Sequence, residues 1–209
     1  MVTKRATKAH DTGTRLRLME ATAQIIREEG YAAATSRRVA AVAGVKSALV
    51  YYYFPTMDDL FIAVLRAGAE KALDRMRQAL TADDPLQVLW DINTDARFTQ
   101  LNTEFMALAN HRKAVGVELK AFAERVRDIE TAAVTLVLRS CGVDLDRYPP
   151  VVVSMLLTGA SRILCNEGAV GMRQGHAELR AFVQDLMGRY RPAVVSPGVG
   201  TAPVRDPAQ

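Results

Sequence analysis

A short basic and aromatic segment, residues 35–60, holds the side chains of this chain best suited to contact a nucleic acid. It reads TSRRVAAVAGVKSALVYYYFPTMDDL. Cationic side chains bind phosphates and guanine edges, hydroxyl groups bind phosphate oxygens, and apolar groups contact thymine methyls. The candidate contacts are Thr35, Arg37, Lys46, Ser47, Ala48, Leu49, Tyr51, Tyr52, Tyr53 and Thr56.

The residue types divide these candidates into two roles. Base edges are expected opposite Ser47, Ala48, Leu49 and Tyr51, with Leu49 against a thymine methyl and Lys46 at guanine or a phosphate. Phosphate contacts are expected at Thr35, Arg37, Tyr52, Tyr53 and Thr56. Such contacts fix the position of the protein along the DNA but do not read the base sequence. Three consecutive tyrosines cannot share one helix face, so we expect Tyr53 and Phe54 to be partly buried.

Two short helices around a tight turn are predicted to carry these side chains. Thr35 or Ser36 caps the first helix, because a hydroxyl accepts from free backbone N–H groups at a helix start. Gly44 ends it, since glycine reaches the left-handed conformation without a steric penalty. The second helix is expected over residues 46–53, and Pro55 stops it.

The positive charge of the chain is concentrated in the same region. The formal net charge is +4, yet residues 1–56 carry nine basic and four acidic side chains, and the other 153 residues carry 18 basic and 19 acidic ones. A solvated surface is the ordinary explanation of a charged segment. Here the excess coincides with the predicted helix pair, which indicates a phosphate-bearing partner.

Six short motifs in order between about residues 14 and 65 make the chain similar to a known family. They are Gly30-Tyr31, Thr35, Val39-Ala40, Ala43-Gly44-Val45, Val50-Tyr51 and Phe54. In them the chain resembles the TetR (tetracycline repressor) family of bacterial transcription regulators. The resemblance implies an all-α fold with a DNA-binding head and a ligand-binding, dimerising body.

The chain departs from the family pattern at three positions. Lys46 stands where serine is usual after Ala-Gly-Val, and Ala48 takes the small position two residues on. Met57 stands where family members carry a lysine that often contacts a phosphate, so Lys46 becomes the candidate to supply that contact. Family members use the position of Arg37 for bases or for phosphates, and both roles stay open.

Domain organisation follows from these motifs and from the apolar periodicity further along. We expect a flexible basic arm at residues 1–13, a three-helix DNA-binding domain at 14–56 and a helical ligand-binding and dimerisation domain at 57–190. A Pro- and Gly-rich tail at 191–209 is expected to be disordered. The body is predicted to contain helices over 57–80, 85–97, 98–112, 114–140, 150–168 and 176–190.

The predicted body helices supply large apolar side chains with a few polar ones, as small-molecule sites do. The same residues at helical spacing also suit an ordinary core. The pocket candidates are Trp90, Phe98, Leu101, Asn102, Phe105, Met106, Asn110, Phe122, Met155 and Thr158.

The apolar helix at 150–168 and one face of 176–190 need a covering partner. Either they complete the core of one chain, or they pair with a second copy; the resemblance favours the second. Small residues in the first helix would allow close approach. The predicted interface comprises Gly159, Ala160, Ile163, Leu179, Phe182, Val183 and Leu186.

Other functional classes find little support in the sequence. The three histidines are dispersed, and no nucleophile elbow, phosphate loop or zinc spacing occurs, so we predict no enzyme, metal or cofactor. Cys141 and Cys165 are too few for a disulfide framework. No apolar run reaches membrane-spanning length and no signal peptide is evident, so we expect a cytoplasmic protein without a membrane partner.

The sequence therefore predicts a transcriptional repressor that binds a palindromic operator in double-stranded DNA as a homodimer. A small, largely apolar effector is expected to release it. An activator of the same fold, or a helical ligand-binding or scaffold protein without DNA function, remains an alternative.

Overall fold

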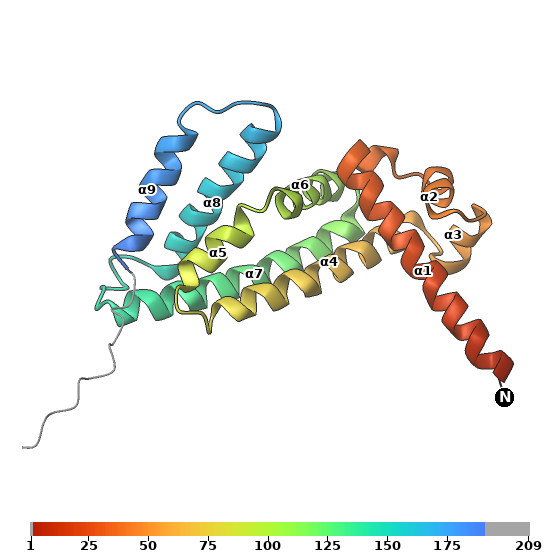
Figure 1. Ribbon diagram of the computed structural model, residues 1–209, viewed down its shortest axis with the longest axis horizontal. Helices are drawn as coiled ribbons and strands as arrows, with labels where there is room; N and C mark the ends of the chain where they lie inside the picture. The colour runs from red at the N-terminus through yellow and green to blue at the C-terminus, as the bar shows by residue number, and fades with distance from the viewer. Residues whose placement is uncertain (1, 191–209) are drawn as a thin grey trace, which may run out of the picture.

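The computed structural model of the protein describes residues 2–190, with side chains from residue 12 onward (Figure 1). Every regular element in that part of the chain is helical, which confirms the all-α prediction. The predicted tail at 191–209 lies outside the described residues. The helices are α1 (Val2–Glu29), the short 3-10 helix η1 (Tyr31–Ala33), α2 (Ser36–Ala43), α3 (Ala48–Tyr53), α4 (Met57–Ala79), α5 (Pro85–Asn93), α6 (Ala96–His111), α7 (Lys113–Ser140), α8 (Pro150–Ala169) and α9 (His176–Gly188).

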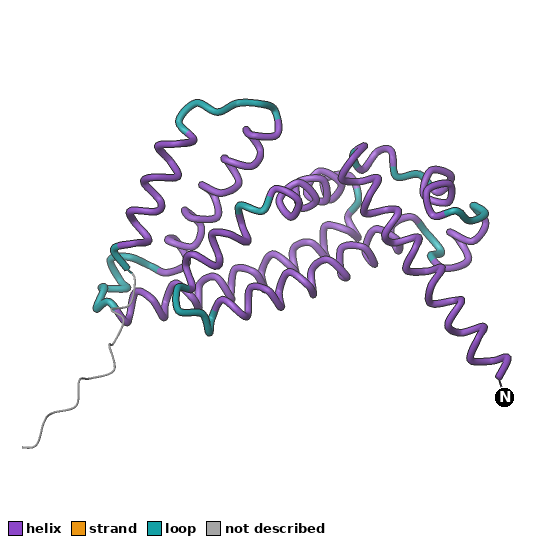
Figure 2. Tube along the Cα trace, in the orientation of Figure 1, coloured by secondary structure: helices purple, strands orange, loops and turns teal. Residues whose placement is uncertain are grey.

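The helices form an elongated molecule with a small head at one end. Figure 2 shows α1, α2 and α3 gathered at that end, and the α8–α9 hairpin at the opposite end. The long helices α4 and α7 pack against each other along the molecule, and α6 contacts both α7 and α1. Helix α6 therefore lies between the head and the rest of the body.

The start of the chain differs from the expected arm at 1–13. Residues 2–13 continue α1 as helix instead of forming a separate segment. This stretch contains no proline, and alanine, lysine and arginine favour the helical backbone. A single glycine, Gly13, weakens the helix without ending it.

A second difference lies at the predicted helix boundary near residue 97. The break falls earlier, between Asn93 and Ala96. The Thr94 hydroxyl donates to the carbonyl of Trp90 at 2.8 Å, and the Asp95 carboxylate accepts from the backbone N–H of Arg97 at 3.0 Å. These two contacts end α5 and cap α6, because a side-chain acceptor satisfies the free N–H groups of a helix start.

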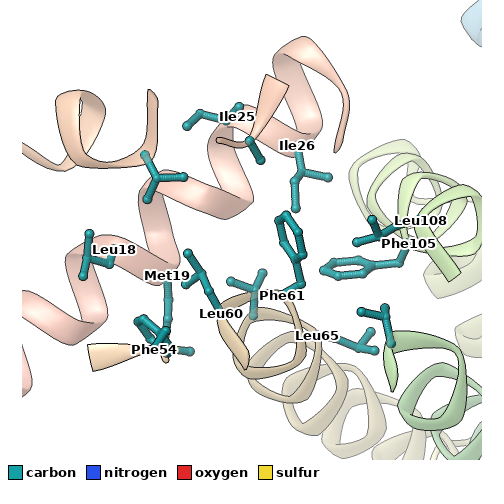
Figure 3. Packing of buried hydrophobic residues seen from close by; sticks show 14 of the residues in the cluster. Leu18, Met19, Ile25, Ile26, Phe54, Leu60, Phe61, Leu65, Phe105 and Leu108 are labelled. Carbon is teal, nitrogen blue, oxygen red and sulfur yellow. The ribbon is translucent and has the colours of Figure 1, made fainter. Parts of the chain in front are cut away.

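One continuous apolar core joins head and body. It runs from Leu18 in α1 to Phe122 in α7 and crosses the predicted domain boundary at 56/57. Figure 3 shows Phe61 of α4 lying between Ile26 of α1 and Phe105 of α6. The head is thus packed on the body through side chains rather than held by a linker.

Replacing Phe61 with alanine should test this junction. Phe61 is 2% exposed, so we expect the free energy of unfolding to fall by about 3–5 kcal/mol through lost burial and the cavity left behind. Urea denaturation followed by circular dichroism measures the change. The exposed Val117→Ala serves as the control, and a Phe61→Ala loss as small as the control's would contradict the junction's role.

Candidate DNA-binding interface and ligand cavities

Local hydrogen bonds fix the two-helix element in the head. The Thr35 hydroxyl accepts from the backbone N–H of Arg38 at 3.3 Å, which caps α2. Gly44 ends that helix with φ of +66°, a conformation that favours glycine. Val45 then donates its N–H to the carbonyl of Ala40 at 2.9 Å and packs against the core. The predicted helix-turn-helix is present.

The second helix is shorter than predicted. Helix α3 begins at Ala48, so Lys46 and Ser47 lie in the turn before it, and both are exposed. Val50 and Phe54 anchor α3 in the core, at 0% and 2% exposure. Ala48, on the other side, is exposed to solvent.

The three tyrosines take different positions, as expected. Tyr52 is exposed, and Tyr53 is half-buried with its ring edge-on to that of Tyr52 at 5.0 Å. The hydroxyl of the exposed Tyr51 donates to Ser36 Oγ in α2 at 3.3 Å. The expected burial of Tyr53 and Phe54 is confirmed. Leu49 is half-buried, so only part of it can meet a thymine methyl.

Thr56 has a structural role in the head. Its hydroxyl donates to Asp59 Oδ2 at 2.7 Å and accepts from the backbone N–H of Asp59 at 3.1 Å. The backbone N–H of Thr56 also donates to Asp59 Oδ2, which completes a capping box for α4. Because the hydroxyl proton is already used, Thr56 can hold a phosphate only by breaking this cap.

Two neighbouring arginines in α2 differ in availability. Arg38 pairs with Glu29 at the end of α1, with 2.6 Å between Nη2 and Oε1. The hydrogen bond from Arg38 lowers the pKa of Glu29 and raises the pKa of Arg38. Arg37 is exposed and has no ion-pair partner within residues 12–190. Arg37 is therefore free to reach a phosphate, whereas Arg38 is held by the protein.

Three small cavities of the body share walls, and a larger, open hollow of about 750 Å³ lies between α6 and α8. The apolar cavity, about 50 Å³, lies between α4, α6 and α7. The polar cavity, also about 50 Å³, shares Phe98, Asn102 and Phe122 with it. The third, about 10 Å³, contains Trp90 and shares Thr158 with the polar cavity.

Most of the predicted pocket residues line these cavities. They are Trp90, Phe98, Leu101, Asn102, Phe105, Phe122 and Thr158. Met106, Asn110 and Met155 line none of the three and are exposed, so the structure does not support their assignment. Helical spacing alone does not tell which turn of a helix faces inward; Met155 lies on the outer face of α8.

A buried carboxylate that the sequence analysis missed lies beside these cavities. Glu130 of α7 is 2% exposed. Its oxygens accept from Asn93 Nδ2 at 2.9 Å, Ser154 Oγ at 2.9 Å and Thr158 Oγ1 at 3.1 Å. The sequence did hold a signal, because Glu130 falls four residues after Val126 within the apolar stripe of its helix. A charge in such a stripe requires buried partners.

Helix α6 connects the cavities to the head. Its residues Phe98 and Phe105 line the apolar cavity. Glu104 on the same helix accepts from the backbone N–H of Tyr31 at 2.9 Å, and Gln100 donates to the carbonyl of Arg27 at 2.9 Å. The end of α1 and the start of η1 are therefore bonded to a wall of the cavity.

The outer side of α8 and α9 is apolar and uncovered. Leu156 is 69% exposed, Ile163 49% and Phe182 65%. Other predicted interface residues are half-buried: Gly159, Ala160, Leu179 and Leu186. Val183 is 3% exposed and packs within the chain's own core, so it does not belong to this outer face.

Two features are absent from the part of the chain that the structure describes. No helix there is both long and apolar enough to cross a membrane. No group of three or more His, Cys, Asp or Glu side chains in that part of the chain is placed to hold a metal ion.

A helix-turn-helix head on a helical body with internal cavities defines a class of DNA-binding regulators. Residues 18–64 match the profile described as bacterial regulatory proteins, tetR family. The chain is 31% identical over 108 residues to the HTH-type transcriptional regulator PksA of Bacillus subtilis (strain 168), a match covering 47% of this chain and 53% of PksA. The chain thus spans about half the length of this relative.

Solved structures share the fold over most of the chain. A regulator of Mesorhizobium loti MAFF303099 attributed to the TetR family aligns with a TM-score of 0.66 at 18% identity, covering 86% of this chain and 96% of that one. The regulator FadR of Bacillus subtilis, solved in complex with stearoyl-CoA, aligns with a TM-score of 0.65 at 13% identity, covering 86% and 98%. The head of the chain is therefore similar to that of the tetR family of bacterial regulatory proteins, and the chain as a whole shares the fold of these solved structures.

The two arginines of α2 give a matched pair for testing the interface. We expect Arg37→Gln to weaken binding to duplex DNA and to reduce the slope of log affinity against log salt by roughly one, as losing one phosphate contact does. Arg38→Gln should change that slope much less, because Arg38 pairs with Glu29. Fluorescence anisotropy across a salt series measures both. Equal slopes for the two variants would contradict the assignment.

Proposed function

We propose that this protein is a repressor that binds a palindromic operator as a homodimer and leaves DNA when a small, largely apolar effector enters its body. One observation carries the proposal. Helix α6 lines the apolar cavity with Phe98 and Phe105 and holds the head through Glu104 and Gln100. A ligand that displaces α6 therefore acts on the head directly.

The free cations of the head support DNA binding. Arg37 and Lys46 are exposed and have no ion-pair partner among the described residues. Together with the exposed Tyr51 and Tyr52, they offer charge and hydroxyl groups on the same element. We propose that Lys46 and the exposed side of α3 meet the major groove, with Arg37 and Tyr52 at phosphates.

The uncovered face of α8 and α9 supports dimerisation. Large apolar side chains exposed together on one face mark interaction surfaces. The hairpin lies at the end of the molecule away from the head (Figure 1). Pairing two copies there about a two-fold axis leaves both heads free, and two recognition helices about 34–36 Å apart fit successive major grooves of a palindrome.

The size of the cavities supports a release mechanism. At about 50 Å³ each, the apolar and polar cavities are below the roughly 300–1,000 Å³ of typical ligand pockets, whereas the open hollow between α6 and α8 is about 750 Å³. An effector that fills the apolar or the polar cavity must therefore move a wall, and α6 is the wall bonded to the head. The fold neighbour FadR, solved with stearoyl-CoA, supports an effector with an apolar part. Binding would then favour a conformation in which the heads no longer fit the operator.

The central experiment measures operator binding and oligomeric state together. DNA upstream of the gene for this chain and its neighbours is tested by gel shift, and light scattering gives the mass in solution. We expect a dimer and a salt-sensitive shift on a palindromic fragment. A monomer at working concentration, or binding without sequence preference, would overturn the proposal.

The double variant Leu156→Glu with Phe182→Glu should separate dimerisation from folding. Both side chains are largely exposed in the single chain, so the variant is expected to fold, while charges buried in an interface repel the second copy. Operator affinity should fall by at least about tenfold as the second half-site is lost. Val117→Glu, at another exposed apolar position, is the control. A double variant that remains a dimer and binds the operator with full affinity would contradict the assignment of this face as the dimer interface.

Glu104→Ala should loosen the head without disturbing the body core. Hydrogen bonds to charged groups contribute about 1.5–3 kcal/mol, so amide exchange at Tyr31 should accelerate by about tenfold or more. Glu124→Ala, which removes an exposed partner of Lys120, is the control. Hydrogen-exchange mass spectrometry provides the readout. Unchanged amide exchange around η1 would contradict the proposal that Glu104 connects the body to the head.

A further inference from the structure

We propose that the effector is a small amphipathic carboxylic acid, with its carboxylate held at Arg162 and Arg127 and its compact apolar group in the apolar cavity. The inference rests on the proposed function, because it assigns a ligand class to the same body site.

The apolar and polar cavities together present one apolar end and one charged end. The apolar cavity is lined by Leu65, Leu101 and Phe105. The polar cavity adds Arg127 and Arg162 to the shared wall. A ligand that spans both must therefore carry a polar group at one end only. Burial of the apolar end supplies affinity, and the polar end supplies selectivity.

The buried carboxylate of Glu130 is not the recognition group. Its Oε1 accepts from Asn93 and Thr158, and its Oε2 accepts from Ser154 and Thr158. A carboxylate offers about four lone-pair sites, and these three donors, with the one proton of Thr158 shared between both oxygens, use most of that capacity. A cationic ligand would have to displace protein donors to reach Glu130, which disfavours an amine.

The donors that remain are guanidinium groups. Arg162 is exposed at the mouth of the polar cavity and has no hydrogen-bond or ion-pair partner within residues 12–190. Arg127 donates to Ser154 Oγ at 3.2 Å and lies 3.7 Å from Glu130 Oε2, which leaves other N–H groups unused. Arg127, Arg162 and Glu130 together carry one excess positive charge. A carboxylate balances that charge and accepts two parallel hydrogen bonds from an arginine.

Asn102 lies where the two cavities meet. It lines both, and its only hydrogen-bond contact among the described residues is a weak one, 4.0 Å from Nδ2 to Met106 Sδ. Its amide can therefore bond to the ligand between the two ends. Because each cavity is small, a short branched chain or a single ring displaces the walls least.

The test compares ligands matched in shape and different in charge. Isothermal titration calorimetry on the full chain is run with 3-methylbutanoate and 3-phenylpropanoate, and with the amide and the amine corresponding to each. Trp90 is the single tryptophan of the chain and lines the neighbouring cavity, so its fluorescence gives a second readout. At least one carboxylate should bind at least about tenfold more tightly than its amide and its amine, as expected for charge-assisted bonds.

Variants locate the carboxylate. Arg162→Gln should weaken carboxylate binding by at least about tenfold and amide binding by less than about threefold. Arg139→Gln, an exposed arginine of α7 that lines no cavity, should leave both unchanged. Arg162 suits the test because it makes no bond to the Glu130 network.

Each outcome bears on either the ligand class or the proposed function. Amides or amines that bind as tightly as the carboxylates, unchanged binding in Arg162→Gln, or no carboxylate binding up to about 10 mM would overturn the ligand class. DNA release is measured separately by gel shift. Carboxylate binding that depends on Arg162 without release from the operator would keep the ligand class and overturn the release mechanism.

Discussion

The packing of α1 against α4 and α6 is the interaction on which the rest of the structure depends. Ile26, Phe61 and Phe105 come from three helices and meet in one buried contact. Protein interiors are close-packed, so a wall that shifts must move its neighbours or open a cavity. Because the head has no separate core, a displacement of α6 in the body cannot leave α1 in place. Coupling between the two ends follows from the absence of a flexible joint.

The Glu130 network lines two of the cavities in the body. Burying a carboxylate is costly unless hydrogen bonds compensate, and here Asn93, Ser154 and Thr158 surround it. Two small polar side chains of α8, Ser154 and Thr158, bond to Glu130 of α7 and line the third cavity. Arg127 donates to Ser154 of this network, whereas Arg162 lines the polar cavity without a bond to it. The residues that compensate the buried charge therefore also line two of the cavities.

The structure of the head could be predicted from contacts between residues close in sequence, whereas that of the body could be predicted only in part. Gly44 and the Thr35 cap each act within a few residues, so their types and spacing were enough to predict the turn. The inward turns of a long helix depend on which neighbours it meets, and that information is distributed over the chain. Met155, which helical spacing predicted to line the pocket, is therefore exposed, and Val183, which it predicted to lie in the interface, is buried.

The departure at Met57 has a physical explanation in the packing of the head. Met57 begins α4, is half-buried and packs against the core, where a lysine would keep its charge in solvent. The position thus serves the junction between head and body rather than a phosphate. Thr56 beside it is committed to its cap, and Arg38 to Glu29. The free positive charge of the helix-turn-helix is consequently confined to Arg37 and Lys46.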